Sequence, residues 1–213
     1  MLSRHMREPF SGLSHLLGAL LALVGLVYML ANLPEQRTAE YLASYLVFGL
    51  SMMLMFGASA IYHLTDTDEE GIRKLKRVDH MAIFIMIAGS YTPFCLLGLN
   101  ASQGWWMFAI VWGIALFGIG VKIFWLHAPR WLSTALYLGM GWVAIAVFEP
   151  LSAALSSGAI QWLVGGGIAY SVGAIVYGCK WPNLHEKFGF HELWHLFVLA
   201  GAGCHFISIG VYL

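Results

Sequence analysis

The sequence predicts an all-α integral membrane protein, a bundle of seven transmembrane helices with a cytoplasmic N-terminus and an external C-terminus. Of its 213 residues 60% are hydrophobic and only 10% are charged, and the few charges leave long uncharged stretches between them. Soluble domains have about 25% charged residues, so the solvent for most of this chain is lipid. With 11 basic and 11 acidic residues the formal net charge is zero, which excludes a basic surface that binds nucleic acid.

The uncharged stretches mark the membrane crossings, because a helix needs about 20 apolar residues to span the hydrocarbon core. Five stretches accommodate one helix each, and the stretch 80–121 accommodates two, separated by the turn-forming segment 98–104. The surplus of the stretch 150–179 predicts a loop from Pro150 to Gly158. We therefore expect one domain, residues 1–213, with helices at 11–32, 41–64, 79–99, 104–126, 130–149, 157–179 and 190–212.

Three local features refine this outline. The first span follows Arg4 and Arg7 as a signal peptide would, but its apolar run is too long and no convincing small-residue cleavage site precedes Pro34. We therefore interpret it as a retained helix. Pro93 lies inside the third span and predicts a kink. The charged segment 65–78 between the second and third spans predicts a solvated turn that contacts anionic lipid.

The basic residues are distributed unequally between the two ends of the predicted bundle. One end has Arg37 alone. The other has the remaining ten: Arg4, Arg7, Arg73, Lys74, Lys76, Arg77, Lys122, Arg130, Lys180 and Lys187. Because Lys and Arg accumulate on the cytoplasmic side, this asymmetry places the N-terminus inside and the C-terminus outside. That topology is opposite to a G-protein-coupled receptor, and no lysine follows Lys187 to form the Schiff base of a retinal protein.

Five ionisable side chains are expected at the cytoplasmic end. His63 ends the second span, Asp79 and His80 begin the third, and His191 and His195 begin the seventh. Ionisable residues within a membrane are costly and usually mark a functional site. His191 and His195 are four residues apart, so they share a helical face and can bind one metal ion. With His63 as a third imidazole and a water as fourth ligand, they predict a catalytic zinc site.

Two further residues complete this predicted site. Ser59 lies four residues before His63 and shares its helical face. Asp79 has no basic partner in its own apolar helix, so its carboxylate is a candidate general base for a zinc-activated water. The alternative is that these histidines only hydrogen-bond lipid headgroups. His63, Asp79 and Ser59 are expected at the same depth in the membrane, which favours the metal site.

The other histidines have less specific roles. His15 begins the first span, where it either supports the metal ligands at the mouth of the site or lies at the lipid interface. His80 is rotated by about 100° from the aspartate before it, so we expect it to support the site from outside or to contact headgroups. His127 and His185 lie in predicted loops, where they are solvated. His205 lies deep in the seventh span and is expected to be a hydrogen-bonded packing residue.

Residues 191–195, His-Glu-Leu-Trp-His, also match the H-E-x-x-H pattern of zinc metalloproteases. In that hypothesis a third ligand follows downstream. No acidic residue follows Glu192, and His205 lies about 15 Å further along the helix, too far to share the metal. We therefore expect Glu192 to be an interfacial carboxylate near a helix N-terminus.

Several motifs, taken in chain order, resemble those of a known family. They are SHLLG at 14–18, SAIYH at 59–63, VDH at 78–80 leading to GSYTPF at 89–94, the pair His191 and His195, and CHF at 204–206. This set resembles the hemolysin III proteins of bacteria, which belong with the progestin and adiponectin receptors in a wider superfamily of membrane metal hydrolases related to alkaline ceramidases. The resemblance implies a seven-helix fold, a cytoplasmic N-terminus and a zinc held by three histidines. In this sequence the three histidines correspond to His63, His191 and His195, with Asp79 and Ser59 nearby.

The resemblance also implies a reaction class, the zinc-dependent hydrolysis of a lipid amide or ester. Zinc would activate a water, Asp79 would take its proton, and Ser59 would hydrogen-bond the tetrahedral oxygens or the ligand shell. A membrane lipid or fatty-acid-like molecule would occupy the bundle. One alternative is a non-catalytic membrane sensor or regulator with a structural zinc. Another is a pore-forming cytolysin, which the confinement of polar residues to one end disfavours. We expect a multi-pass protein of a bacterial inner membrane.

Overall fold

The structure is a computed structural model that describes residues 6–185 and 188–213, without the side chain of Thr38. Arg4 and Lys187, two of the residues that predict the orientation, lie outside the described residues. The described part contains seven helical segments long and apolar enough to cross a membrane, which confirms the predicted all-α seven-helix class. Its elements are α1 (Pro9–Ala31), α2 (Thr38–Leu64), α3 (Glu69–Pro93), the π-helix η2 (Phe94–Gly98), α4 (Ala101–Phe124), α5 (Arg130–Trp142), the 3-10 helix η3 (Val143–Val147), α6 (Phe148–Ala154), α7 (Ser157–Cys179) and α8 (Phe190–Gly210).

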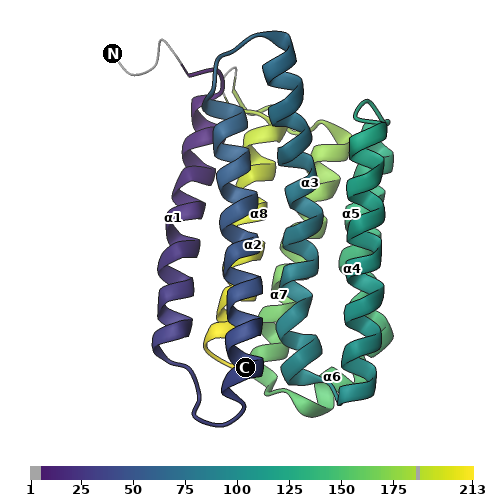
Figure 1. Ribbon diagram of the computed structural model, residues 1–213. Coiled ribbons are helices and arrows are strands. Elements are labelled where there is room, and N and C mark those ends of the chain that lie inside the picture. Colours follow the sequence, from purple (N-terminus) through teal and green to yellow (C-terminus); the bar gives the residue numbers. More distant parts are fainter. Residues whose placement is uncertain (1–5, 186–187) are drawn as a thin grey trace.

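The crossings lie side by side as an open-ended bundle (Figure 1). Helix α2 packs between α1 and α3, α8 packs against α1 and α7, and α4 and α5 complete the far side. The start of α1 and the end of α8 lie at opposite ends of the bundle, as an odd number of crossings requires. The outward faces are apolar: Val24, Leu116 and Phe117 are 65%, 66% and 64% exposed. Such faces are stable only against lipid.

The third crossing begins at Glu69 rather than at residue 79, so most of the predicted turn is helical, although its charged side chains are exposed as expected. Asp68 caps the helix, with its side chain accepting a hydrogen bond from the Gly71 N–H at 2.8 Å. Glu70 and Lys74 form an ion pair at 2.7 Å, at the i and i+4 positions that stabilise a helix. These local interactions extend α3 beyond the apolar stretch on which the predicted boundary was based.

Two other predicted boundaries differ for similar reasons. The loop expected from Pro150 to Gly158 shrinks to two residues, because α6 includes Pro150 in its first turn, where a missing N–H costs no intrahelical hydrogen bond. The turn expected at 98–104 is also shorter. The Asn100 side chain accepts a hydrogen bond from the Gln103 N–H at 3.0 Å and so starts α4 early.

Non-α backbone occurs inside two crossings, and in each the polar groups find partners. At Pro93, where a kink was predicted, the hydrogen bonding changes from α to π because proline has no N–H to donate. The second site is the junction of α5 and η3. There the Tyr91 hydroxyl donates to the carbonyl oxygens of Met140 (3.0 Å) and Gly141 (2.5 Å) and accepts from the Ala144 N–H (2.9 Å). Lipid offers no such partners, so α3 stabilises the break in its neighbour.

Candidate metal centre

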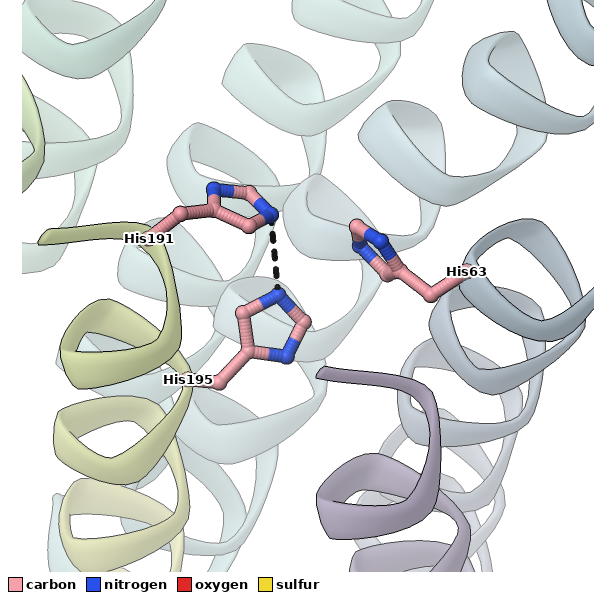
Figure 2. A group of neighbouring side chains, drawn as sticks. All are labelled: His63, His191 and His195. Carbon is pink, nitrogen blue, oxygen red and sulfur yellow. Dashed lines mark hydrogen bonds between the residues drawn. The ribbon is translucent and has the colours of Figure 1, made fainter. Parts of the chain in front are cut away.

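Three histidine side chains meet at the end of the bundle where α2 ends and α8 begins (Figure 2). His63 lies in the last turn of α2, and His191 and His195 lie in the first two turns of α8. One nitrogen atom of each ring lies within 4.8 Å of those of the other two. His63 and His195 are each 2% exposed, so protein encloses the cluster. The predicted ligand set therefore converges in space, although 128 residues separate His63 from His191.

The spacing of the nitrogen atoms fits a first-row metal ion. The Nε2 atoms of His191 and His195 lie 3.3 Å apart. Two nitrogen ligands at about 2.0–2.1 Å from a tetrahedral ion are about 3.3–3.4 Å apart, so this pair already spans one edge of the tetrahedron. His63 would need only a small shift to complete the triangle. Three imidazoles with one open position suit zinc and also other metal ions that bind histidine.

Glu8, the residue just before α1, supports the histidine cluster. Its carboxylate lies 2.5 Å from Nδ1 of His63, and its backbone N–H donates to the His63 carbonyl at 2.9 Å. The pKa of Glu8 lies below its usual range because it is hydrogen-bonded to this imidazole. With Nδ1 occupied, Nε2 of His63 is the atom available to a metal, as in the carboxylate–histidine–metal arrangement of many metal sites. The sequence offered only a weak signal for this role, an acidic residue at the boundary of an apolar span.

Ser59 and His15 form a buried polar pair beside the histidine cluster. Nδ1 of His15 lies 2.8 Å from the Ser59 hydroxyl, and both residues are 3% exposed. The His15 ring lies against that of His195, with 3.9 Å between the centroids. His15 was predicted at the mouth of the site or at the lipid interface. The structure places it inside, in direct contact with the candidate ligands.

Asp79 is buried in α3 at the same level and faces this group. Its carboxylate is 6% exposed and interacts with the Ser59 hydroxyl and electrostatically with His63. Burial of a charged group is costly without partners, so the Asp79 carboxylate depends on these polar neighbours. The geometry therefore brings Asp79, Ser59 and His63 together from two neighbouring helices.

His80 lies beside this group without joining it. Its Nε2 atom is 4.0 Å from the Asp79 carboxylate, longer than a hydrogen bond. Its Nδ1 atom is buried without a hydrogen-bond partner, while its backbone carbonyl accepts from the Tyr137 hydroxyl at 3.1 Å. The side chain thus lies outside the histidine triangle, on the side of α4.

The Glu192 side chain caps the N-terminus of α8. Its carboxylate accepts a hydrogen bond from the Gly189 N–H at 2.9 Å and lies 3.5 Å from the Ser11 hydroxyl. This is the interaction of a capping residue with the free N–H groups of a helix N-terminus. The placement agrees with the interfacial role expected for Glu192 and differs from that of a metalloprotease base.

A cavity of about 460 Å³ extends from the histidine cluster into the bundle. Its upper wall includes the three histidines with Ser59 and Asp79, and its deeper wall is mostly apolar. His205 lines the deep part, and its ring packs edge-on against Tyr170. Neither of its ring nitrogens has a hydrogen-bond partner, so the hydrogen bond predicted for His205 is wrong. The apolar lining and the single polar end match an amphiphilic ligand.

Comparison with known proteins places this site in a family context. The chain matches the family described as Haemolysin-III related over residues 3–206. It is similar to the hemolysin-3 homolog of Bacillus subtilis (strain 168), with 38% identity over 206 residues that cover 96% of this chain and 93% of the relative. Hemolysin-3 of Bacillus cereus is 36% identical over 207 residues, covering 96% and 91%. The monocyte to macrophage differentiation factor of Homo sapiens is 27% identical over 175 residues, covering 78% and 69%.

Proposed function

The chain belongs to the haemolysin-III-related family of multi-pass membrane proteins, and from its histidine cluster we propose that it is a zinc-dependent hydrolase of a lipid amide or ester. The observation that carries the proposal is the meeting of His63, His191 and His195 at the polar end of an apolar cavity. A purely structural metal would need no cavity beside it. We place the protein in the cytoplasmic membrane of a bacterium, with this site at the inner face, as the distribution of Lys and Arg favours.

The donor set suits zinc in a catalytic role. Three neutral imidazoles leave the fourth tetrahedral position open, whereas structural zinc sites fill all four positions with protein ligands. When bound, zinc would supply Lewis acidity and lower the pKa of a coordinated water towards ~7. Glu8 would hold the His63 ring with Nε2 directed at the cluster.

The remaining polar side chains have distinct roles in this proposal. Asp79 accepts the proton of the attacking water and then donates it to the leaving group, since its carboxylate lies at the cluster and no lysine or arginine neutralises it through an ion pair among the described residues. Ser59, whose hydroxyl lies 2.8 Å from Nδ1 of His15, would turn its one proton from Asp79 to the oxygen on which charge develops.

The substrate class follows from the cavity. Its deeper lining includes Met86, Ile145, Leu151 and Leu163, which suit an acyl chain. A scissile amide or ester carbonyl at the polar end would then lie beside Asp79 and Ser59. We therefore propose a membrane lipid or fatty-acid-like molecule as the ligand.

The experiment compares two carboxylate-to-amide variants of the purified, zinc-loaded protein on a panel of lipid amides and esters. Asp79→Asn should keep its zinc, because the three histidines are intact, and should lose about 10²–10⁴-fold in turnover rate. Glu192→Gln is the matched control and should retain activity, since an amide oxygen can still cap α8. Equal rates in wild type and Asp79→Asn would reject Asp79 as the base. If the wild type holds zinc but hydrolyses no member of the panel, the metal has a structural role.

A further inference from the structure

A second polar group lies in the same cavity, on the wall formed by α4 and α5. Lys122, in the last turn of α4, is 1% exposed and lines the cavity. Its ammonium group donates a hydrogen bond to the Ser133 hydroxyl of α5 at 2.5 Å. Ser133 is itself buried and lines the same cavity. One hydroxyl satisfies one of the three N–H donors of an ammonium group, so the charge is incompletely compensated.

A second lysine lies near Lys122, and the acid on the same cavity wall, Asp79, faces the histidine cluster. Among the described residues, no carboxylate lies within ion-pair distance of its ammonium. Lys76 of α3 is close enough to Lys122 for their charges to interact. His80 is close enough to interact with both lysines. All three line the cavity. Asp79 interacts with Lys76 but is engaged by Ser59 on the side of the histidine cluster.

Ordinary structural reasons account for only part of this arrangement. A cation near the C-terminus of a helix interacts favourably with the helix dipole, which explains a lysine at the end of α4. A lysine serving only that purpose would extend its ammonium to the interface and water. Lys122 instead lies buried against the cavity, with a second lysine nearby. Burying an unpaired charge is costly, and within membranes such residues mark the paths of ligands or ions.

We propose that Lys122, Ser133 and Lys76 form a subsite for the phosphate group of an anionic lipid whose chains occupy the apolar part of the cavity. Phosphate offers several charged acceptor oxygens, which would use the remaining donors of Lys122 together with those of Lys76. His80, whose Nδ1 atom is buried without a partner, supplies a further donor. The subsite shares its cavity with the proposed hydrolytic site and extends that proposal to the ligand's headgroup. It needs neither metal nor turnover, so binding and catalysis can fail independently.

The test measures thermal unfolding of the purified full chain in neutral detergent with three probes. Dioctanoyl phosphatidylglycerol has both chains and phosphate, dioctanoylglycerol has the same chains without phosphate, and inorganic phosphate has no chains. A ligand that binds the native state raises the unfolding temperature with its concentration. Phosphatidylglycerol should raise it most strongly. An equal rise with dioctanoylglycerol would overturn the phosphate subsite, and an equal rise with inorganic phosphate would overturn its assignment to a lipid.

Variants then locate the effect. Lys122→Met should weaken the apparent affinity for phosphatidylglycerol by about tenfold or more, and Lys122→Arg should retain most of it, because the charge is kept. Lys74→Met is the control, since it removes a lysine that is 69% exposed and paired with Glu70. Equal losses in Lys122→Met and Lys74→Met would reject the assignment. If Lys122→Met does not fold, the wild-type comparison and the Ser133→Ala variant decide the question. A wild type whose unfolding temperature does not distinguish phosphatidylglycerol from dioctanoylglycerol has no such subsite.

Discussion

Glu8 holds His63 through two hydrogen bonds: its carboxylate accepts one from Nδ1 of His63 at 2.5 Å, and its backbone N–H donates the other to the His63 carbonyl at 2.9 Å. The start of α1 is thereby joined to the end of α2. The same contact fixes which ring nitrogen of His63 faces His191 and His195. A residue outside the membrane span thus orients a candidate ligand inside it, an arrangement known to raise the basicity of metal-bound histidine.

Glu8→Ala should weaken metal binding without abolishing it. Loss of a carboxylate that orients a ligating histidine typically costs about 10–100-fold in affinity. Competition between the protein and a chelator of known zinc affinity measures the change. Glu40→Ala is the control, because Glu40 lies in the first turn of α2, at the opposite end of that helix from His63, and its side chain is 48% exposed. Unchanged zinc affinity in Glu8→Ala would show that the His63 ring is held without it.

Removal of any one candidate ligand should release the metal. Purified wild type should hold about one zinc per chain, and His63→Ala, His191→Ala and His195→Ala should each lose it, because two imidazoles alone bind zinc weakly. His205→Ala should keep it, since ten helical residues place His205 about 15 Å along α8 from His195. Elemental analysis of the purified variants gives the answer. Stoichiometric zinc in all three single variants would mean that the ligand set is wrong.

The orientation in the membrane is a separate prediction from the fold. A reporter fused after Leu213 should be external, and one inserted at Thr67, in the short loop between α2 and α3, should be cytoplasmic. Both positions lie outside regular helix, so insertion leaves the crossings intact. The reverse pattern would move the histidine cluster to the outer face and contradict the proposed cytoplasmic site.

Two glycines of α4 offer a matched test of packing. A Cβ atom at Gly104 would meet the backbone carbonyl oxygen of Cys95 in η2, whereas one at Gly113 would meet nothing within 4 Å. Gly104→Ala should therefore destabilise the protein by about 1–3 kcal/mol, the usual cost of overpacking. Gly113→Ala should be neutral or slightly stabilising. Unfolding temperatures in detergent compare the two, and equal effects would show that α4 and η2 can separate without cost.

Hydropathy and the positions of charges were sufficient to predict the number of crossings, because each crossing needs a minimum apolar length, and seven helices among the described residues have it. Boundaries were predicted less well. Asp68 and the pair of Glu70 and Lys74 extend α3 through hydrogen bonds and ion pairs that hydropathy does not register. Similarly, Asn100 caps α4, so this helix begins within the predicted turn.

The sequence by itself determined the membrane class and the candidate ligands His63, His191 and His195, because an ionisable residue in an apolar span is conspicuous and a four-residue spacing defines a helical face. Only the tertiary structure decided that Glu8 binds His63, that His15 lies inside the site beside Ser59, and that Lys122 is buried against the cavity. The reason is physical. Spacing along one helix determines which side chains share a face, whereas contacts between residues 55 or 44 positions apart depend on how the helices pack.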